Sequence, residues 1–440
     1  MALPQKFITY KTRWYILFVW SYLTFFQGFM WNNLDSIYPS LSRAFNFSDD
    51  LVALCSFYAC FSMAVGALPS AGFLERFGLR KIMLTFSAAI AISCGARCVS
   101  GSDFVVKLVT HISALFVAIS AMGVSFVPAH ISATWFPPSQ RKLSTAIGVL
   151  MNVIGVAFSF VVGPQFVDDP ESGTSVETMK KQYWRYTYGQ TGCTVVAFLL
   201  VLVYCPDKPP TPPSESAKKE RIPLIAGCKQ LFRSSHFWVL QVPMTLMVGT
   251  YGGWISVLSV DLAGKDVPQS TAGWIGFVST LSGCLIGLFV GKLADLTGQL
   301  KAIQICLCCL VLEGTVWMVL IFHGFLPFTI RQSYCAVILI AVGTTSFIPI
   351  NFEFAVEGLY PVDEAVVVGL LCSLSNVTSC ACLAVLFFVP QNHTEGLNWF
   401  FAVCTVVSLP FMLSVAARYK RTEVDCVNDP KENQTAVERF

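Results

Sequence analysis

The stretches GFLERFGLRK at residues 72–81 and GKLADLTGQLK at residues 291–301 decide the fold of this chain. Each contains an acidic residue, a glycine three positions later and then a basic residue. The second copy follows the first after half of the 440 residues, and long apolar segments flank both copies. This repeat indicates that the chain consists of two duplicated halves.

The composition indicates a chain that lies mostly in a lipid bilayer. Hydrophobic residues make up 55% and charged residues 12%, and the charged fraction is about half of that in soluble proteins. This composition excludes a soluble or disordered chain, and 17 scattered Cys in a long chain do not predict a disulfide scaffold. A net charge of +3 gives no reason to expect a nucleic-acid partner.

Twelve apolar segments predict an all-α membrane protein with twelve transmembrane helices. The third segment requires Arg97 to lie at its end, where the long side chain reaches the membrane interface. The segments are 14–34, 51–74, 82–96, 108–140, 143–167, 186–206, 234–260, 267–291, 302–330, 332–352, 365–394 and 396–417.

The basic residues predict the orientation in the membrane. If both termini are cytosolic, only a minority of the 29 Lys and Arg residues face the lumen, as the positive-inside rule requires. The sequons at Asn46 and Asn392 are then lumenal and predict glycosylation. The Pro-rich run at 205–213 begins a linker between two six-helix halves. The expected domains are a cytosolic N-terminus 1–13, an N-terminal half 14–206, a linker 207–233, a C-terminal half 234–417 and a cytosolic tail 418–440.

Ionisable residues within membrane spans are costly and therefore mark candidate sites. Those away from the predicted span ends are Asp35, Glu313, Glu353, Glu357 and His130, with no Lys or Arg among them. An anionic interior suits protons or an organic cation. The alternative to a functional role is that Glu313 faces a polar seam between helices and that His130 is a structural residue.

Trp31 and Asp35 are separated by four residues, which places them on one stripe of the first predicted helix. An aromatic ring and a carboxylate together can bind a cationic group of a solute. The alternative is that Trp31 anchors the helix at the membrane interface.

Glu353 and Glu357 have the same spacing near the cytosolic end of the tenth span. We expect Glu353 to carry protons, since it lies deeper and a low-dielectric cavity raises the pKa of a carboxyl group. For Glu357 we expect an ion pair of the cytosolic gate, with proton carriage as the alternative.

The two charged repeats predict a cytosolic gate, because acid and base can bridge neighbouring helices while glycine lets backbones approach. A solvated charged loop is the alternative. The gate residues are Glu75, Arg76, Gly78, Arg80, Asp295 and Gly298.

These repeats resemble the loops of the major facilitator superfamily, apart from Glu75 where Asp is usual. Longer strings resemble solute carrier family 49, and most of all its member 4 branch. They are RW at 13–14, FQG at 26–28, WN at 31–32, SATWFP at 132–137, AGWIG at 272–276 and FEFAVEGLYP at 352–361.

The resemblance implies a transporter of a small amine or vitamin-like solute: choline and ethanolamine for some members, pyridoxine with protons for others, and haem as an older proposal. It assigns Trp31 to an aromatic cage and places a second aromatic at Tyr251 or Trp254. Asn376 lies where the family has a substrate-contacting Gln, so its shorter amide implies a different pocket. The alternative is that Asn376 forms an interhelical hydrogen bond.

Enzymatic and metal chemistry have no support in the sequence. There is no metalloprotease, phosphate-loop or nucleophile-elbow motif, and only five His occur. The Cys at 306, 308 and 309 have no zinc spacing. We expect neither cofactor nor metal.

These patterns together predict a monomeric, proton-coupled secondary active transporter of a small organic solute that works by alternating access. A nutrient sensor on the same fold is the alternative. Glu220 precedes Leu224 and Ile225 by the spacing of an acidic dileucine signal, which Pro223 is expected to keep extended for sorting adaptors. We therefore expect a lysosomal or late endosomal membrane, with the plasma membrane as the alternative.

Overall fold

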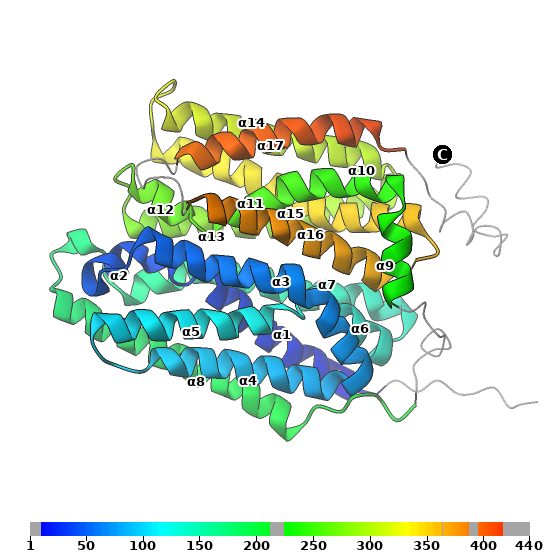
Figure 1. The fold of residues 1–440 in the computed structure, drawn as a ribbon, viewed down its shortest axis with the longest axis horizontal. Helices are drawn as coiled ribbons and strands as arrows, with labels where there is room; N and C mark the ends of the chain where they lie inside the picture. Colours follow the sequence, from blue (N-terminus) through cyan, green and yellow to red (C-terminus); the bar gives the residue numbers. More distant parts are fainter. Residues whose placement is uncertain (1–9, 212–223, 363, 387–394, 417–440) are drawn as a thin grey trace, which may run out of the picture. The chain divides into compact units, whose positions relative to one another are not determined.

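Helices build the part of the chain that the computed structural model describes, which is residues 10–211, 224–362, 364–386 and 395–416 (Figure 1). No strand occurs within these ranges. The chain divides into two compact units: unit 1 comprises Met1–Arg221 with Pro268–Gly273, and unit 2 comprises Ile222–Val267 with Trp274–Phe440. The division falls within the stretch that the sequence identifies as a linker.

Long apolar helices dominate unit 1. Its elements are α1 (Thr12–Trp31), η1 (Asp35–Ile37), α2 (Tyr38–Phe45), α3 (Asp49–Phe77), α4 (Leu79–Arg97), α5 (Asp103–Ala121), α6 (Val127–Trp135), α7 (Pro138–Phe166), η2 (Pro170–Ser172) and α8 (Val176–Val203).

Unit 2 contains more interruptions. Its elements are α9 (Leu224–Phe232), α10 (Ser235–Pro243), the π-helix η4 (Met244–Gly249), α11 (Thr250–Ile255), α12 (Leu258–Ala263), α13 (Gln269–Thr297, whose first turn belongs to unit 1), α14 (Leu300–Phe322), α15 (Ile330–Leu359), α16 (Glu364–Leu386) and α17 (Glu395–Ser414).

Ten helices in the described ranges are long and apolar enough to cross a membrane. The first and seventh predicted spans are not among them. The first is α1, a single helix of 20 residues. The seventh is divided into α10, η4 and α11, and the helix breaks between Ile255 and Leu258.

The repeated glycines occupy equivalent positions in the two units. Gly78 follows the end of α3 with a φ of 85°, and Gly298 follows the end of α13 with a φ of 66°. Each donates a 2.9 Å backbone hydrogen bond to the carbonyl four residues earlier, on Leu74 and Ala294 respectively. Only glycine adopts this backbone at little cost. The local structure therefore repeats together with the sequence.

Glycines also set the contact between α1 and α7 in unit 1. A Cβ atom on Gly28 would collide with the backbone carbonyl of Asn152, and one on Gly155 would collide with that of Phe25. At this contact the Asn152 side chain donates to the side-chain oxygen of Gln27 at 2.7 Å. Small residues thus allow α1 and α7 to approach closely enough for the Gln27 and Asn152 amides to pair.

Candidate functional site

Trp31 and Asp35 lie close together, although not on one helix as the sequence predicts. Helix α1 ends at Trp31, and Asp35 begins the short 3-10 helix η1. Two Asn residues between them favour non-helical turns, because their side chains compete for backbone hydrogen bonds. Both Trp31 and Asp35 nevertheless line one pocket of unit 1, in which Trp31 is half-buried and Asp35 only 2% exposed.

The expectation that Arg97 extends to the membrane interface is wrong. Arg97 is the last residue of α4, yet only 2% of it is exposed, and it lines the same pocket. Its Nη1 donates to Oδ1 of Asn33 at 3.2 Å, and Nδ2 of Asn33 lies 3.4 Å from Oε1 of Gln190. The interior of unit 1 therefore contains a cation, which corrects the prediction of an interior without Lys or Arg.

We call this site the Arg97 pocket. Its polar lining comes from Asp35, Ser56 and Arg97, with the ring of Trp31 and the thiol of Cys55 beside them. Apolar side chains of α1, α3 and α5 complete the wall. A carboxylate, a guanidinium and an aromatic ring therefore line one small cavity of about 20 Å³, which as it stands has room for about one water molecule.

In unit 2, the structure distinguishes the two aromatic candidates Tyr251 and Trp254. Nε1 of Trp254 donates to Oδ1 of Asn398 at 2.7 Å, and Nδ2 of Asn398 donates to Oδ2 of Asp261 at 2.9 Å. Trp254 is 1% exposed and therefore held within a buried polar chain, whereas Tyr251 is 9% exposed and packs on it at a ring distance of 6.3 Å. Sequence reasoning missed Asp261 and Asn398, because each falls at the edge of a predicted span.

Asn376 makes a local contact. Its Nδ2 donates to the carbonyl of Cys372, four residues earlier in α16, at 2.9 Å, and the side chain is half-buried. In the described structure the amide of Asn376 therefore forms a hydrogen bond within its own helix, and not the hydrogen bond between helices that the sequence offered as an alternative.

The two glutamates of α15 differ in burial in the order opposite to that expected. Glu357 is buried, whereas Glu353 is exposed. Glu357 precedes Gly358, where an added Cβ atom would meet the imidazole of His236 on α10. Glu313, at mid-length on α14, is also exposed.

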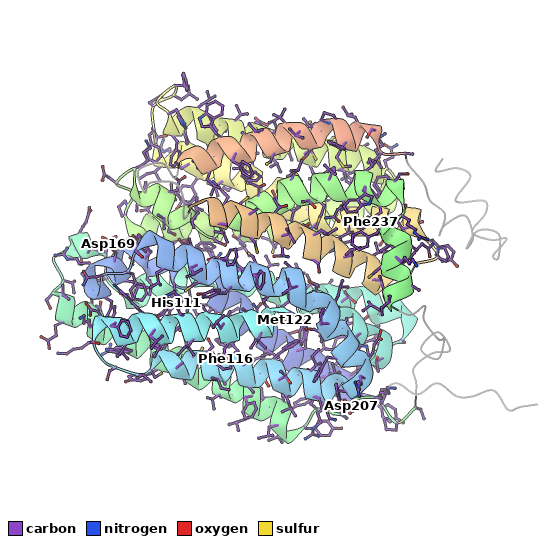
Figure 2. The ribbon with its side chains drawn as sticks, in the orientation of Figure 1. His111, Phe116, Met122, Asp169, Asp207 and Phe237 are labelled. Carbon is purple, nitrogen blue, oxygen red and sulfur yellow. The ribbon has the colours of Figure 1, made fainter. Side chains whose placement is uncertain are left out.

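The first gate repeat contacts the end of α8. The backbone N–H of Arg80 donates to Oδ1 of Asp207 at 2.7 Å, and its guanidinium donates to the carbonyl of Leu202 at 3.2 Å. A Cβ atom on Gly78 would lie 2.5 Å from the same carboxylate oxygen of Asp207. Figure 2 labels Asp207. Sequence reasoning missed Asp207, because it lies in the Pro-rich run and far from the repeat.

The other gate residues contribute less. Glu75 and Arg76 are exposed, and Arg76 lies over the ring of Phe77 at 5.3 Å. Around Gly298 there is open space for a Cβ atom, so this glycine is required by its φ alone. The backbone of Asp295 belongs to α13, and its side chain lies outside the described part.

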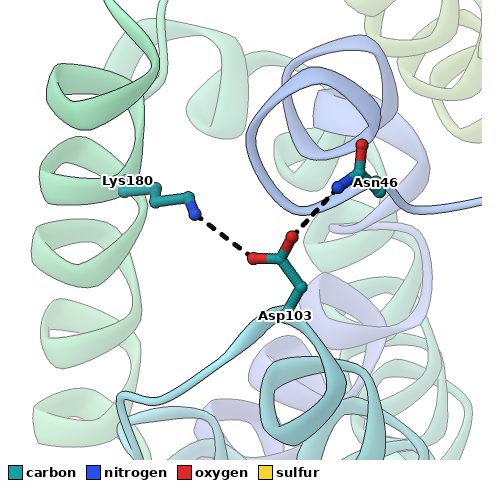
Figure 3. Close-up of polar contacts among 3 residues, drawn as sticks. All are labelled: Asn46, Asp103 and Lys180. Carbon is teal, nitrogen blue, oxygen red and sulfur yellow. Dashed lines mark hydrogen bonds and ion pairs between the residues drawn. The ribbon is translucent and has the colours of Figure 1, made fainter.

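Asn46 and Asn392 are the predicted glycosylation sites. Asn46 is exposed and has a φ of 54° at the end of α2. Its Nδ2 donates to Asp103 at 3.0 Å, and Lys180 pairs with the other oxygen of that carboxylate at 3.2 Å (Figure 3). Asn392 lies outside the described residues.

The predicted sorting residues Leu224 and Ile225 are not extended. They are the first two residues of α9. Ile225 is 82% exposed and Leu224 is half-buried. Glu220 and Pro223 lie outside the described residues.

Gln269 forms a polar cluster that the sequence did not indicate. Its Oε1 accepts hydrogen bonds from the backbone N–H and hydroxyl of Ser40 at 3.2 and 2.8 Å. Its Nε2 donates to the carbonyl of Val167 at 3.2 Å, and its backbone N–H donates to Asp169 at 2.8 Å. Gln269 is buried, and its hydrogen bonds lie within unit 1, to which the first turn of α13 belongs. No motif marks this residue.

The described residues contain no group of three or more His, Cys, Asp or Glu side chains that could hold a metal ion.

Comparison with known proteins identifies the family. The profile of the Major Facilitator Superfamily matches residues 21–381. The chain is 31% identical to the Solute carrier family 49 member 4 homolog of Xenopus laevis, covering 96% of this chain and 95% of that protein. It is 24% identical to the human Choline/ethanolamine transporter FLVCR2, covering 87% and 72% respectively.

Solved structures share the fold. A D-xylose-proton symporter superposes with a TM-score of 0.71 at 13% identity, covering 92% of this chain and 98% of that one. A bacterial homolog of the human lysosomal transporter Spinster, in an inward-facing state, gives 0.63 at 13% identity, covering 94% and 97%. At this identity the likeness concerns the fold alone.

Proposed function

Because the chain belongs to the major facilitator superfamily and, within it, to solute carrier family 49, we propose that it moves a small organic solute by alternating access. It is a multi-pass membrane transporter and not an enzyme. The observation that carries the proposal is the Arg97 pocket, which combines an aromatic ring with buried charges in a membrane-spanning unit. Such groups are costly in a membrane protein and are retained where they act on a solute.

The solute belongs to the amine or vitamin-like class, of which choline and pyridoxine are the examples to test. Trp31 and Asp35 can receive a cationic group through the ring face and the carboxylate. The human relative is named as a choline and ethanolamine transporter, which supports this class. In unit 2 the candidate solute-binding residues are Tyr251 and Asn376. The ring of Trp254 packs against that of Tyr251.

Protons are the proposed coupling ion, with Glu353 as the carrier. Glu353 is exposed on α15, whose other charged residues are Arg331 at its start and Glu357 near its end. Protonation of Glu353 would lower the cost of moving its side chain through an apolar environment during the cycle. Glu357 is buried and belongs to the gate in this proposal, together with Glu75, Arg76, Gly78, Arg80, Asp295 and Gly298.

The proposed location is a lysosomal or late endosomal membrane, with the plasma membrane as the alternative. Sorting adaptors would bind the exposed Ile225 and the adjacent Leu224 after the first turn of α9 unfolds. Asn46 and Asn392 would carry glycans on the lumenal side, and transfer to Asn46 requires its amide to leave Asp103.

Uptake of labelled pyridoxine and choline tests the proposed function. The protein is directed to the surface of cells, and uptake is measured at two external pH values against cells without the protein. We expect uptake of at least one solute above background, and faster uptake at the pH that provides the favourable proton gradient. Equal uptake with and without the protein, at confirmed surface expression, would contradict the proposal.

A further inference from the structure

The seventh predicted span is interrupted between two polar side chains. Helix α11 ends at Ile255 and α12 begins at Leu258. Trp254 lies just before this break, and Asp261 lies in the first turn of α12 after it. The backbone of a broken turn does not follow the regular helical hydrogen-bond pattern, so it does not fix the direction of the next segment. The relative position of α11 and α12 therefore depends on contacts with other helices of unit 2.

One amide on α17 contacts both segments. Oδ1 of Asn398 accepts from Nε1 of Trp254 at 2.7 Å, and Nδ2 of Asn398 donates to Oδ2 of Asp261 at 2.9 Å. All three side chains are buried. An indole N–H only donates and an ionised carboxylate only accepts, so one orientation of the amide serves both partners. Asn398 therefore bridges the break in the seventh span.

Aromatic packing connects Trp254 to the candidate solute-binding residue Tyr251. Their ring centroids are 6.3 Å apart, and the ring of Phe401 lies 5.8 Å from that of Trp254 and 6.4 Å from that of Tyr251. Phe401 is on α17, three residues after Asn398. In a closely packed interior a shift of one ring displaces its neighbours. The directional hydrogen bond from Trp254 to Asn398 fixes the indole, which ring packing alone does not orient.

Buried polar groups in a membrane protein are costly, and apolar side chains could fill the same space at lower cost. We propose that Asn398 and Asp261 are positioning residues for transport. They hold Trp254, and through its ring Tyr251, in the arrangement that receives the solute. Neither of the two contacts the solute. The inference rests on the transport function proposed above, in which Tyr251 binds the solute.

An exchange of the two polar residues separates their hydrogen bonds from the space they fill. In Asn398→Asp two carboxylates face each other. In the double variant Asn398→Asp, Asp261→Asn, an amide and a carboxylate face each other again with their positions exchanged. The carboxylate at position 398 can then accept from Trp254 and from the amide at position 261, so both hydrogen bonds can form again.

The measurement is the concentration dependence of uptake of labelled choline and labelled pyridoxine, at matched amounts of protein on the cell surface. We expect Asn398→Asp to raise the apparent KM about fivefold, because a buried hydrogen bond to a charged group is lost. The double variant should return the KM to within about twofold of the wild type. The maximal rate should change less than the KM, since the affected residue binds the solute.

Two further variants complete the design. Trp399→Phe is the matched control, because it removes a hydrogen bond from an exposed indole of α17 to His323 and should leave the KM unchanged. Asn398→Ala removes both hydrogen bonds without adding a charge, and it replaces Asn398→Asp if that variant does not reach the surface. It should also raise the KM, and the addition of Asp261→Asn should not restore it.

Two results would overturn the inference. One is an unchanged KM in the variants of Asn398, even if their surface expression or maximal rate falls. The other is a double variant that performs no better than Asn398→Asp. Failure of the proposed function gives a different result, because the wild type then takes up neither solute above background, and the inference is rejected with it.

Discussion

Nη1 of Arg97 lies 3.2 Å from Oδ1 of Asn33, so the end of α4 is tied to the turn that follows α1. The same turn places Asp35 in the pocket that Arg97 lines. Alternating access requires contacts that differ between states. The hydrogen bond between Arg97 and the turn after α1 is a contact that can differ between states.

Trp31 should contribute to amine binding. We expect Trp31→Ala to weaken binding of choline by about 1 to 2 kcal/mol, since a cation–π contact is lost, and Trp31→Phe to keep part of it. The measurement is the concentration dependence of uptake at matched surface expression. Trp274→Ala, at an exposed aromatic of α13, serves as the control. Equal uptake by wild type and Trp31→Ala would place Trp31 outside the binding site.

Arg80 should act on turnover. It holds the α3–α4 corner to the end of α8 through Asp207 and Leu202, and this contact does not involve the Arg97 pocket. We expect Arg80→Ala and Asp207→Ala each to change the maximal rate more than the apparent affinity, because they shift the balance between states. Lys229→Ala on α9 should change neither value. A loss of affinity with a normal maximal rate would argue against a gate.

Glu353 should set the pH dependence of transport. The variant Glu353→Gln keeps the shape of the side chain but cannot titrate, so uptake should lose most of its response to a proton gradient. The measurement is uptake at two external pH values, with the exposed Glu177→Gln as control. An unchanged pH response in Glu353→Gln would remove this residue from proton coupling.

Gly28 should be essential for stability. An Ala side chain would meet the backbone carbonyl of Asn152, which cannot move aside, so we expect Gly28→Ala to destabilise the protein by about 1 to 3 kcal/mol. Gly189→Ala is the matched control, because its Cβ atom enters open space in α8. Thermal unfolding of both purified variants checks this. Equal melting temperatures would mean that α1 and α7 are less closely packed.

Leu224 and Ile225 should direct the protein within the cell. Replacing both by Ala should move it from lysosomes to the cell surface, as seen by surface labelling. Replacing Val195 and Val196, two neighbouring exposed residues of α8, should not. Unchanged lysosomal residence of the first variant would exclude this pair as the signal.

The sequence predicts the membrane fold and the repeat of the charged loop because both depend on local patterns. Apolar runs of sufficient length form spans, and the glycine after an acidic turn adopts the positive φ seen at Gly78 and Gly298.

The sequence could not predict the burial of Arg97, because hydropathy assigns a charged residue to the nearest span end. The residue that receives its hydrogen bond is 64 positions away in the chain. The roles of Asp207, Gln269 and Asn398 likewise depend on contacts between distant segments, which no single-sequence pattern reports.

The most direct test of the central claim uses the purified protein in liposomes. Uptake of labelled pyridoxine and choline is measured with and without an imposed proton gradient, against protein-free liposomes. The account predicts uptake of at least one solute above the protein-free level, and accumulation when the gradient is applied. Uptake of both solutes at the protein-free level, with the protein shown to be folded and inserted, would contradict it.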